Sequence, residues 1–70
     1  MEPIMPETFV ANSSALDFAQ YDPETDIMKV WFAKGGTARY PVSRVEFEGL
    51  KTASSVGRYF NAVIRPKGSF

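Results

Sequence analysis

Residues 27–42 read IMKVWFAKGGTARYPV and carry the clearest strand pattern in the chain. Side chains alternate along residues 27–33, as they do in a strand that is buried on one face only. A Gly-Gly pair follows, and two consecutive glycines supply the positive φ angles of a hairpin turn. Residues 37–42 alternate again, and Pro41 places this second strand at an edge of the sheet or at the strand's own end. The stretch therefore predicts a β-hairpin.

The first strand of this hairpin has two different faces. Met28, Val30 and Phe32 share one face, which we expect to meet the core. Trp31 shares the opposite face with Lys29, and an exposed tryptophan edged by lysine is typical of a binding platform. The alternative is that Trp31 is covered by the N-terminal residues or by a partner subunit.

On the N-terminal side, residues 15–21 alternate and predict another strand, with Leu16 and Phe18 on one face. Asp22-Pro23-Glu24-Thr25 then turns the chain, because proline presets φ and the aspartate can accept hydrogen bonds from the turn amides. Residues 1–11 contain two prolines and no sustained period. We interpret them as a flexible leader in which Phe9 and Val10 dock loosely.

On the C-terminal side the period changes to that of a helix. Ser43 and Glu46 have the spacing of a capping box. The helix that follows should point Val45, Phe47, Leu50 and Ala53 inward. Gly49 inside it costs about 1 kcal/mol relative to alanine, which indicates a close approach to another backbone.

A second helix is predicted over residues 56–64, and Pro66 should bar its extension. Its apolar stripe is Val56, Phe60, Val63 and Ile64. The order β-β-β-α-α predicts an α+β fold, in which a three-stranded antiparallel meander packs against a C-terminal helical hairpin. We expect one domain over residues 12–66, followed by a short tail at 67–70.

Composition limits the chemistry. The 70 residues include 44% hydrophobic side chains but no cysteine and no histidine. Serine or cysteine triads, histidine acid/base schemes and zinc sites with thiolate or imidazole ligands are therefore excluded, so we expect no enzyme, no metal and no cofactor. The longest apolar runs are far shorter than the roughly 20 residues of a membrane helix, and the acidic, proline-broken start is unlike a secretory signal. A cytoplasmic location is the default expectation.

Charge is unevenly distributed although the formal net charge is zero. Residues 1–28 contain six acids and no base, whereas residues 29–70 contain eight bases and two acids. A basic surface of this kind attracts polyanions, because each Lys or Arg that meets a phosphate releases counterions. The alternative is that the two halves of one small fold simply face and neutralise each other.

Candidate binding residues combine these cations with aromatic and amide side chains that can stack on bases and grip phosphates. They are Trp31, Lys34, Arg39, Tyr40, Arg58, Tyr59, Asn61, Arg65 and Lys67. The two tyrosines also suit core positions from which the hydroxyl reaches the surface. Convergence of Trp31 with the three arginines would favour a polyanion as ligand, and dispersal would favour a protein.

The chain resembles the KTSC domain family, which is named after the C-terminal extension of some lysyl-tRNA synthetases. The resemblance covers residues 13–65 and includes the Ser13-Ser14 start, the YDPET turn at 21–25, the MKVWF strand at 28–32 and ASSVGRYFN at 53–61. Where the family has Tyr-x-Tyr, this chain has Ala38-Arg39-Tyr40, so only Tyr40 carries over. The resemblance implies the fold and an RNA-binding role.

Two functions from different classes follow. The first is a non-catalytic module that binds RNA or tRNA as an accessory to translation, with phosphate contacts from Lys34, Arg39, Arg58, Arg65 and Lys67 and stacking on Trp31 or Tyr40. The second is a protein-interaction module, such as a small phage or bacterial protein that binds the transcription or translation machinery. The neutral net charge, the Trp31 face and the edge strand favour the second.

Overall fold

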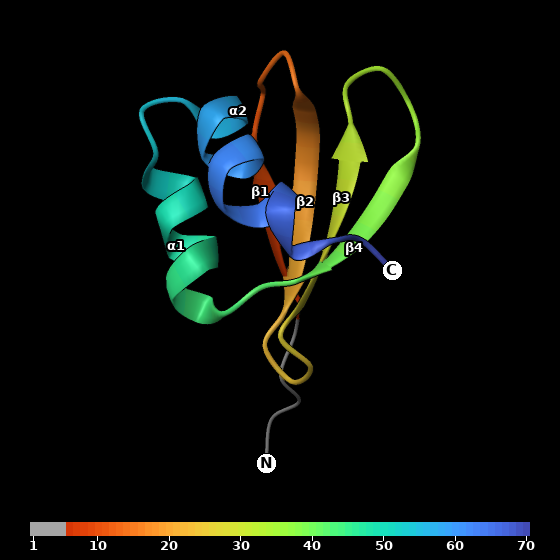
Figure 1. Ribbon diagram of the computed structural model, residues 1–70, viewed down its shortest axis with the longest axis vertical. Coiled ribbons are helices and arrows are strands. Elements are labelled where there is room, and N and C mark those ends of the chain that lie inside the picture. The colour runs from red at the N-terminus through yellow and green to blue at the C-terminus, as the bar shows by residue number, and fades with distance from the viewer. Residues whose placement is uncertain (1–5) are drawn as a thin grey trace.

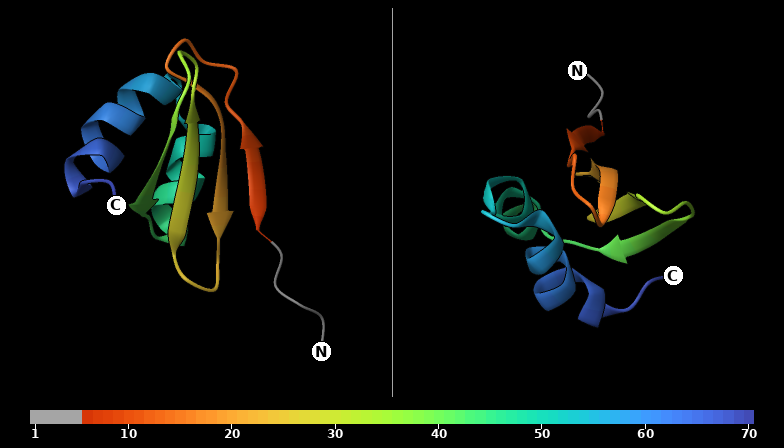
Figure 2. Two further views of the ribbon diagram at one scale, coloured as in Figure 1. Left: turned by 90° about the vertical axis from the view of Figure 1, so that its right-hand side faces the viewer. Right: turned by 90° about the horizontal axis from the view of Figure 1, so that it is seen from above.

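The computed structural model describes residues 6–70. Four antiparallel strands form one sheet in the order β1 (Glu7–Val10), β2 (Leu16–Asp22), β3 (Ile27–Phe32) and β4 (Thr37–Pro41). The chain continues through α1 (Arg44–Thr52), α2 (Val56–Tyr59), the π-helical turn η1 (Phe60–Ile64) and the 3-10 turn η2 (Arg65–Lys67). These helical segments cover one face of the sheet and leave the other open (Figures 1 and 2). The predicted α+β class is confirmed.

The prediction of three strands was wrong, because part of the expected leader is the strand β1. It pairs in register with β2 from Glu7↔Tyr21 to Val10↔Phe18. A strand of four residues is too short for alternation to be recognised in the sequence. β1 is stabilised as a strand by its pairing with β2, which no local pattern indicates. The remainder of the expected leader, residues 1–5, lies outside the described residues.

Both hairpin turns form as the sequence predicts. The Asp22 carboxylate accepts a hydrogen bond from the Glu24 amide at 2.9 Å, as expected for an aspartate that opens a turn. Gly35 and Gly36 have φ angles of +102° and +88°, which side chains with a Cβ rarely adopt. β4 ends at Pro41 and lies at the edge of the sheet, as its proline indicates.

α1 begins and packs largely as predicted. Both hydrogen bonds of the capping box are present, from the Glu46 amide to Ser43 and from the Ser43 amide to Glu46. Phe47 and Leu50 are fully buried. Val45, however, is 79% exposed, so its predicted inward position was wrong. It precedes Phe47 by two residues, which is about 200° around a helix of 3.6 residues per turn, so the two side chains cannot share a face.

The predicted second helix exists in three short pieces. After α2 the winding widens, and the Arg65 amide donates to the Phe60 carbonyl, a π-type hydrogen bond. Pro66 does not stop the helical path, because it lies in the first turn of η2, where its missing N–H costs nothing. The helical path ends at Gly68, with a φ of +85°. Residues 67–70 were expected to form a tail. Their last residue lies beside β4, because the Phe70 amide donates to the Arg39 carbonyl at 2.9 Å.

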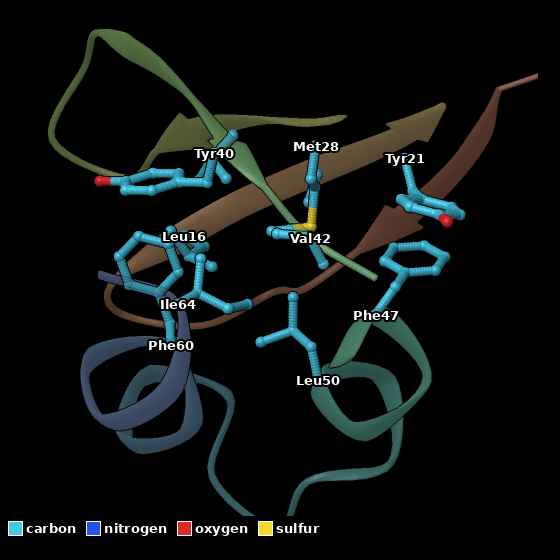
Figure 3. Close-up of a cluster of buried hydrophobic side chains, with 11 residues drawn as sticks. Leu16, Tyr21, Met28, Tyr40, Val42, Phe47, Leu50, Phe60 and Ile64 are labelled. Atoms are coloured by element: carbon cyan, nitrogen blue, oxygen red, sulfur yellow. The ribbon is translucent and has the colours of Figure 1, made fainter. Parts of the chain in front are cut away.

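The core lies between the sheet and the helical layer (Figure 3). Phe47 of α1 stacks on Tyr21 of β2, with ring centroids 4.9 Å apart. Phe60 of η1 meets Tyr40 of β4 edge to face at 5.3 Å. The fully or nearly fully buried apolar residues are Leu16, Ala19, Tyr21, Met28, Val30, Tyr40, Val42, Phe47, Leu50, Phe60 and Ile64. Every strand from β2 to β4, together with α1 and η1, supplies residues to this one cluster.

Candidate binding surface

The sheet face away from the helices carries two neighbouring rows of side chains that cross all four strands. The strand register aligns Val10, Phe18, Trp31 and Thr37 in an apolar row. A second, polar row lies two residues further along each strand. The register aligns in it Thr8, Gln20, Lys29 and Arg39. These eight residues are called the open face below.

Two stacked aromatic rings form the centre of the apolar row. The Phe18 and Trp31 rings are nearly parallel, at 19°, with centroids 4.4 Å apart. Lys29 Nζ lies 5.0 Å from the centroid of the Trp31 ring, within cation–π range. The stack leaves both rings half-buried, and Val10 beside them is 71% exposed. The prediction that Trp31 and Lys29 share a face is confirmed, and β1 lies beside β2, not over Trp31.

Two cations lie opposite each other in the polar row. Lys29 pairs directly with Arg39 across β3 and β4, and with Gln20 across β2 and β3. The Arg39 guanidinium carbon lies 5.6 Å from the Phe70 ring centroid. Within residues 6–70, neither Lys29 nor Arg39 forms an ion pair. An open depression of about 320 Å³ adjoins this row, and it is lined by Pro6, Gln20, Asp22, Thr25, Ile27, Lys29 and Arg39.

An irregularity in β2 brings Phe18 to the open face. Leu16 pairs with Phe32, but Phe18 pairs with Trp31, so the register shifts between them. Because of this bulge Leu16 points into the core while Phe18 stacks on Trp31. The prediction that Leu16 and Phe18 share one face was therefore wrong, since alternation holds only where a strand has no extra residue.

The predicted binding residues separate into groups, and the open face holds only Trp31 and Arg39. Tyr40 is 5% exposed and belongs to the core. Tyr59 is half-buried and packs against Gly49 of α1. Arg58 is exposed on α2, within the helical layer.

A second group lies near the turn between β3 and β4. Lys34, Asn61 and Arg65 line one groove together with Ser14, Ala15, Phe32 and Gly35. Arg65 Nη1 donates to the Asn61 amide oxygen at 3.2 Å. Lys67 is apart from both groups, because its Nζ pairs with a Glu46 carboxylate oxygen at 2.9 Å. Trp31 therefore converges with one of the three arginines, Arg39, while Arg58 and Arg65 lie elsewhere. By the criterion set from the sequence, Arg39 favours a polyanion, and the dispersal of the other two arginines favours a protein ligand.

Ion pairs neutralise part of the basic half of the chain. Arg44 pairs with Glu7 of β1 and, at 3.3 Å, with Glu48, and Lys51 lies 3.7 Å from the Glu48 carboxylate. The hydrogen bond from Arg44 lowers the pKa of Glu7. Of the ion pairs in residues 6–70, the one between Glu7 and Arg44 joins the acidic N-terminal half to the basic half, so charge neutralisation between the halves is local.

Glu46 links the start of α1 to the C-terminal turn. Partial burial opposes ionisation of its carboxyl, but hydrogen bonds from Ser43 and the charge of Lys67 outweigh this and lower the pKa of Glu46. Lys67 is thus engaged in holding η2 against α1, which leaves Lys29, Lys34, Arg39, Arg58 and Arg65 as the cations without ion pairs among the described residues.

The structure adds six residues to the open face that are not among the predicted binding residues: Thr8, Val10, Phe18, Gln20, Lys29 and Thr37. Phe18 was placed on the same face as Leu16 because alternation was extended across the bulge, and Thr8 and Val10 were assigned to the leader. The sequence of Glu7–Val10 carries no strand signal of its own, because two polar residues are followed by two apolar ones without alternation. Within residues 6–70, no three acidic side chains gather as metal ligands would, and no helix is long and apolar enough to cross a membrane.

An antiparallel sheet with short helices on one face and no helix on the other places the chain among the small α+β domains. The chain belongs to the KTSC domain family, whose family model matches residues 12–70. A KTSC domain protein from Yersinia pestis has a similar crystal structure, with a TM-score of 0.82, 27% sequence identity and coverage of 94% of this chain and 93% of that one.

Two relatives agree in sequence over 56 residues. An uncharacterized protein of Stutzerimonas stutzeri (strain A1501) is 41% identical over 79% of each chain. A protein of Tsukamurella paurometabola is 38% identical over 79% of this chain and 84% of its own length. The family model and the Yersinia pestis structure confirm the family that the sequence motifs predict.

Proposed function

We propose that this chain is a non-catalytic module that binds single-stranded RNA on its open face, as an accessory to translation. The observation that carries the proposal is the apolar row with its Phe18–Trp31 stack, directly beside a polar row that contains Lys29 and Arg39. Sequence-tolerant binding of single strands combines these same two elements, aromatic rings for bases and cations for phosphates.

The spacing of the rows suits a nucleotide. Neighbouring residues on one face of a strand are two positions apart, which corresponds to about 6.6 Å. A base stacked on Trp31 would then place its phosphate within reach of Lys29 or Arg39, whose side chains are long and flexible. Each stacked base contributes about 1–3 kcal/mol to binding of this type. The KTSC family's association with lysyl-tRNA synthetases supports an RNA ligand by analogy.

Fluorescence anisotropy of a labelled single-stranded RNA tests the proposal. Wild-type protein should bind at low salt, and log K should fall with log salt with a slope of about −1.4, because each single-strand phosphate contact contributes about −0.7. The double variant Lys29→Gln/Arg39→Gln should lose most of this slope. Arg58→Gln, which removes an exposed cation from the helical layer, is the matched control and should leave the slope unchanged.

Stacking is tested separately with Trp31→Ala and Trp31→Phe. The alanine variant should weaken RNA binding by about tenfold, given 1–3 kcal/mol for a stacked base, while phenylalanine should restore most of the affinity. Circular dichroism confirms that both variants are folded. Absence of RNA binding to wild-type protein at low salt would contradict the proposal, as would an equal loss for the Arg58 control.

A protein ligand is the second candidate function, because the open face also suits another polypeptide. Val10 is 71% exposed, and β1 is an edge strand on the side of the sheet away from β4. An exposed apolar side chain beside a strand edge is typical of sheet extension by a partner strand. Pull-down from nuclease-treated bacterial lysate should then recover a stoichiometric partner that Val10→Asp abolishes, and recovery of none would count against this function.

A further inference from the structure

The helical side of the molecule carries a groove that the proposed function does not use. It lies where the turn between β3 and β4 and the loop between β1 and β2 meet η1, and both loops lie at the same end of the sheet (Figure 1). This hairpin groove has a volume of about 460 Å³ and is lined by Ser14, Ala15, Phe32, Lys34, Gly35, Asn61 and Arg65. Its volume falls within the range of about 300–1,000 Å³ that is usual for small-ligand sites.

The groove is cationic. Lys34 and Arg65 contribute two positive charges, and no carboxylate is among the lining residues. Neither side chain takes part in the ion pairs of residues 6–70, which engage Arg44, Lys51 and Lys67 instead. Asn61 accepts a hydrogen bond from Arg65 Nη1 at 3.2 Å and so orients the guanidinium. An anion with several acceptor oxygens is the ligand that such a pair of cations binds best.

The groove also has an aromatic wall. The Phe32 ring is half-buried and is held edge to face against Phe60, with centroids 5.9 Å apart at 77°. Ala15 adds a second apolar contact. A ligand that fits the groove therefore combines an anionic group with a planar apolar group.

We propose that the hairpin groove binds a nucleoside 5′-phosphate, with its phosphate between Lys34 and Arg65 and its base against Phe32. The same chemistry occurs in a free mononucleotide and at the 5′-phosphorylated end of a strand. The site is separate from the open face, because Phe32 points to the helical side of the sheet while Trp31 points to the other.

Isothermal titration calorimetry with AMP, adenosine and inorganic phosphate tests the composite nature of the site. AMP should bind with a stoichiometry of one, and more tightly than adenosine or phosphate alone. Lys34→Gln/Arg65→Gln should weaken AMP binding by at least about tenfold, because the variant removes both charge-assisted contacts to the phosphate. Both residues are exposed, so the variant should remain folded. Arg58→Gln is the control and should leave AMP binding unchanged.

A second pair of ligands separates the two sources of nucleotide. A short RNA with a 5′-phosphate is compared with the same RNA carrying a 5′-hydroxyl. If the phosphorylated RNA binds better and the Lys34/Arg65 variant removes the difference, the groove binds strand ends. Equal binding of the two RNAs together with tight AMP binding assigns it to free nucleotides. No heat with AMP and no difference between the two RNAs overturns the groove proposal, and the open-face proposal is judged independently by the Lys29/Arg39 variant.

Discussion

Gly49 lies in α1 directly against the side chain of Tyr59. A glycine in the middle of α1 lowers helix stability, so its presence predicted that another backbone approaches closely at this position. The structure instead brings a side chain there: a Cβ built on Gly49 would overlap the Tyr59 hydroxyl and lie 2.7 Å from its ring carbon Cζ. Tyr59 thus has a packing role between α1 and α2.

Gly49→Ala should lower the free energy of unfolding by about 1–2 kcal/mol. Overpacking of this kind costs about 1–3 kcal/mol, and the better helix propensity of alanine returns up to about 1 kcal/mol. Urea unfolding measures the difference. Gly57→Ala is the matched control, because its Cβ would lie 3.4 Å from the Ala15 Cβ, an ordinary contact, so the substitution should be neutral or stabilising. Equal effects at the two glycines would refute the packing role of Tyr59.

Tyr21 should make folding sensitive to alkaline pH. A hydrogen bond to Asp26, together with burial, raises the pKa of Tyr21 to about 12 from its usual value of 10.0. The fold therefore favours the protonated phenol, and this stabilisation is fully present below pH 10 and is lost as the pH rises from 10 to about 12.

Spectrophotometric titration of the tyrosines checks this. One phenol should ionise near pH 12, and Tyr21→Phe should remove that step. Urea unfolding of the same variant should show a weaker fall in stability over this alkaline range than wild type. An unchanged titration curve in Tyr21→Phe would show that the step belongs to another residue.

At the scale of elements, those with a strong local signal were predictable. The two glycines of the β3–β4 turn, the capping box of α1 and the alternation of β3 each act within a few residues, and all three form. β1 and the bulge in β2 depend instead on pairing with distant residues. Phe18 reaches the open face because of its register with Trp31, and no pattern within residues 15–21 contains that information.

The strand β1 should contribute to stability through its inward side chain. Phe9 is half-buried against the core, whereas Val10 on the same strand points to the open face and is 71% exposed. Phe9→Ala should therefore lower the free energy of unfolding by about 1–2 kcal/mol, in line with the burial of part of an aromatic side chain. Val10→Ala should change it by less than about 0.5 kcal/mol.

Thermal unfolding compares the two variants directly. A loss of 1 kcal/mol corresponds to about 4–8 °C in Tm for a domain of this size. A Tm for Phe9→Ala that equals that of Val10→Ala would contradict the docking of β1 as an ordered strand.

At the scale of the whole molecule, the sequence supplied the residue types of the binding surfaces but not their distribution. Clustering of cations after residue 29 is visible in the sequence, yet the fold sends Arg39 to the open face, Lys34 and Arg65 to the hairpin groove and Lys67 to a pair with Glu46. Tyr40, chosen for its aromatic ring, lies in the core against Phe60. Only three-dimensional packing decides between these destinations, because aromatic and cationic residues serve both cores and surfaces.

The most direct test of the account maps RNA binding onto the sheet. Titration of ¹⁵N-labelled protein with a 5′-hydroxyl single-stranded RNA should shift the NMR signals of the Trp31 indole, the Gln20 side-chain amide and the backbone of Lys29 and Arg39. Arg58 and the rest of the helical layer should be unaffected. Shifts confined to the helical layer, or no shifts at low salt, would contradict the assignment of the open face as the RNA-binding surface.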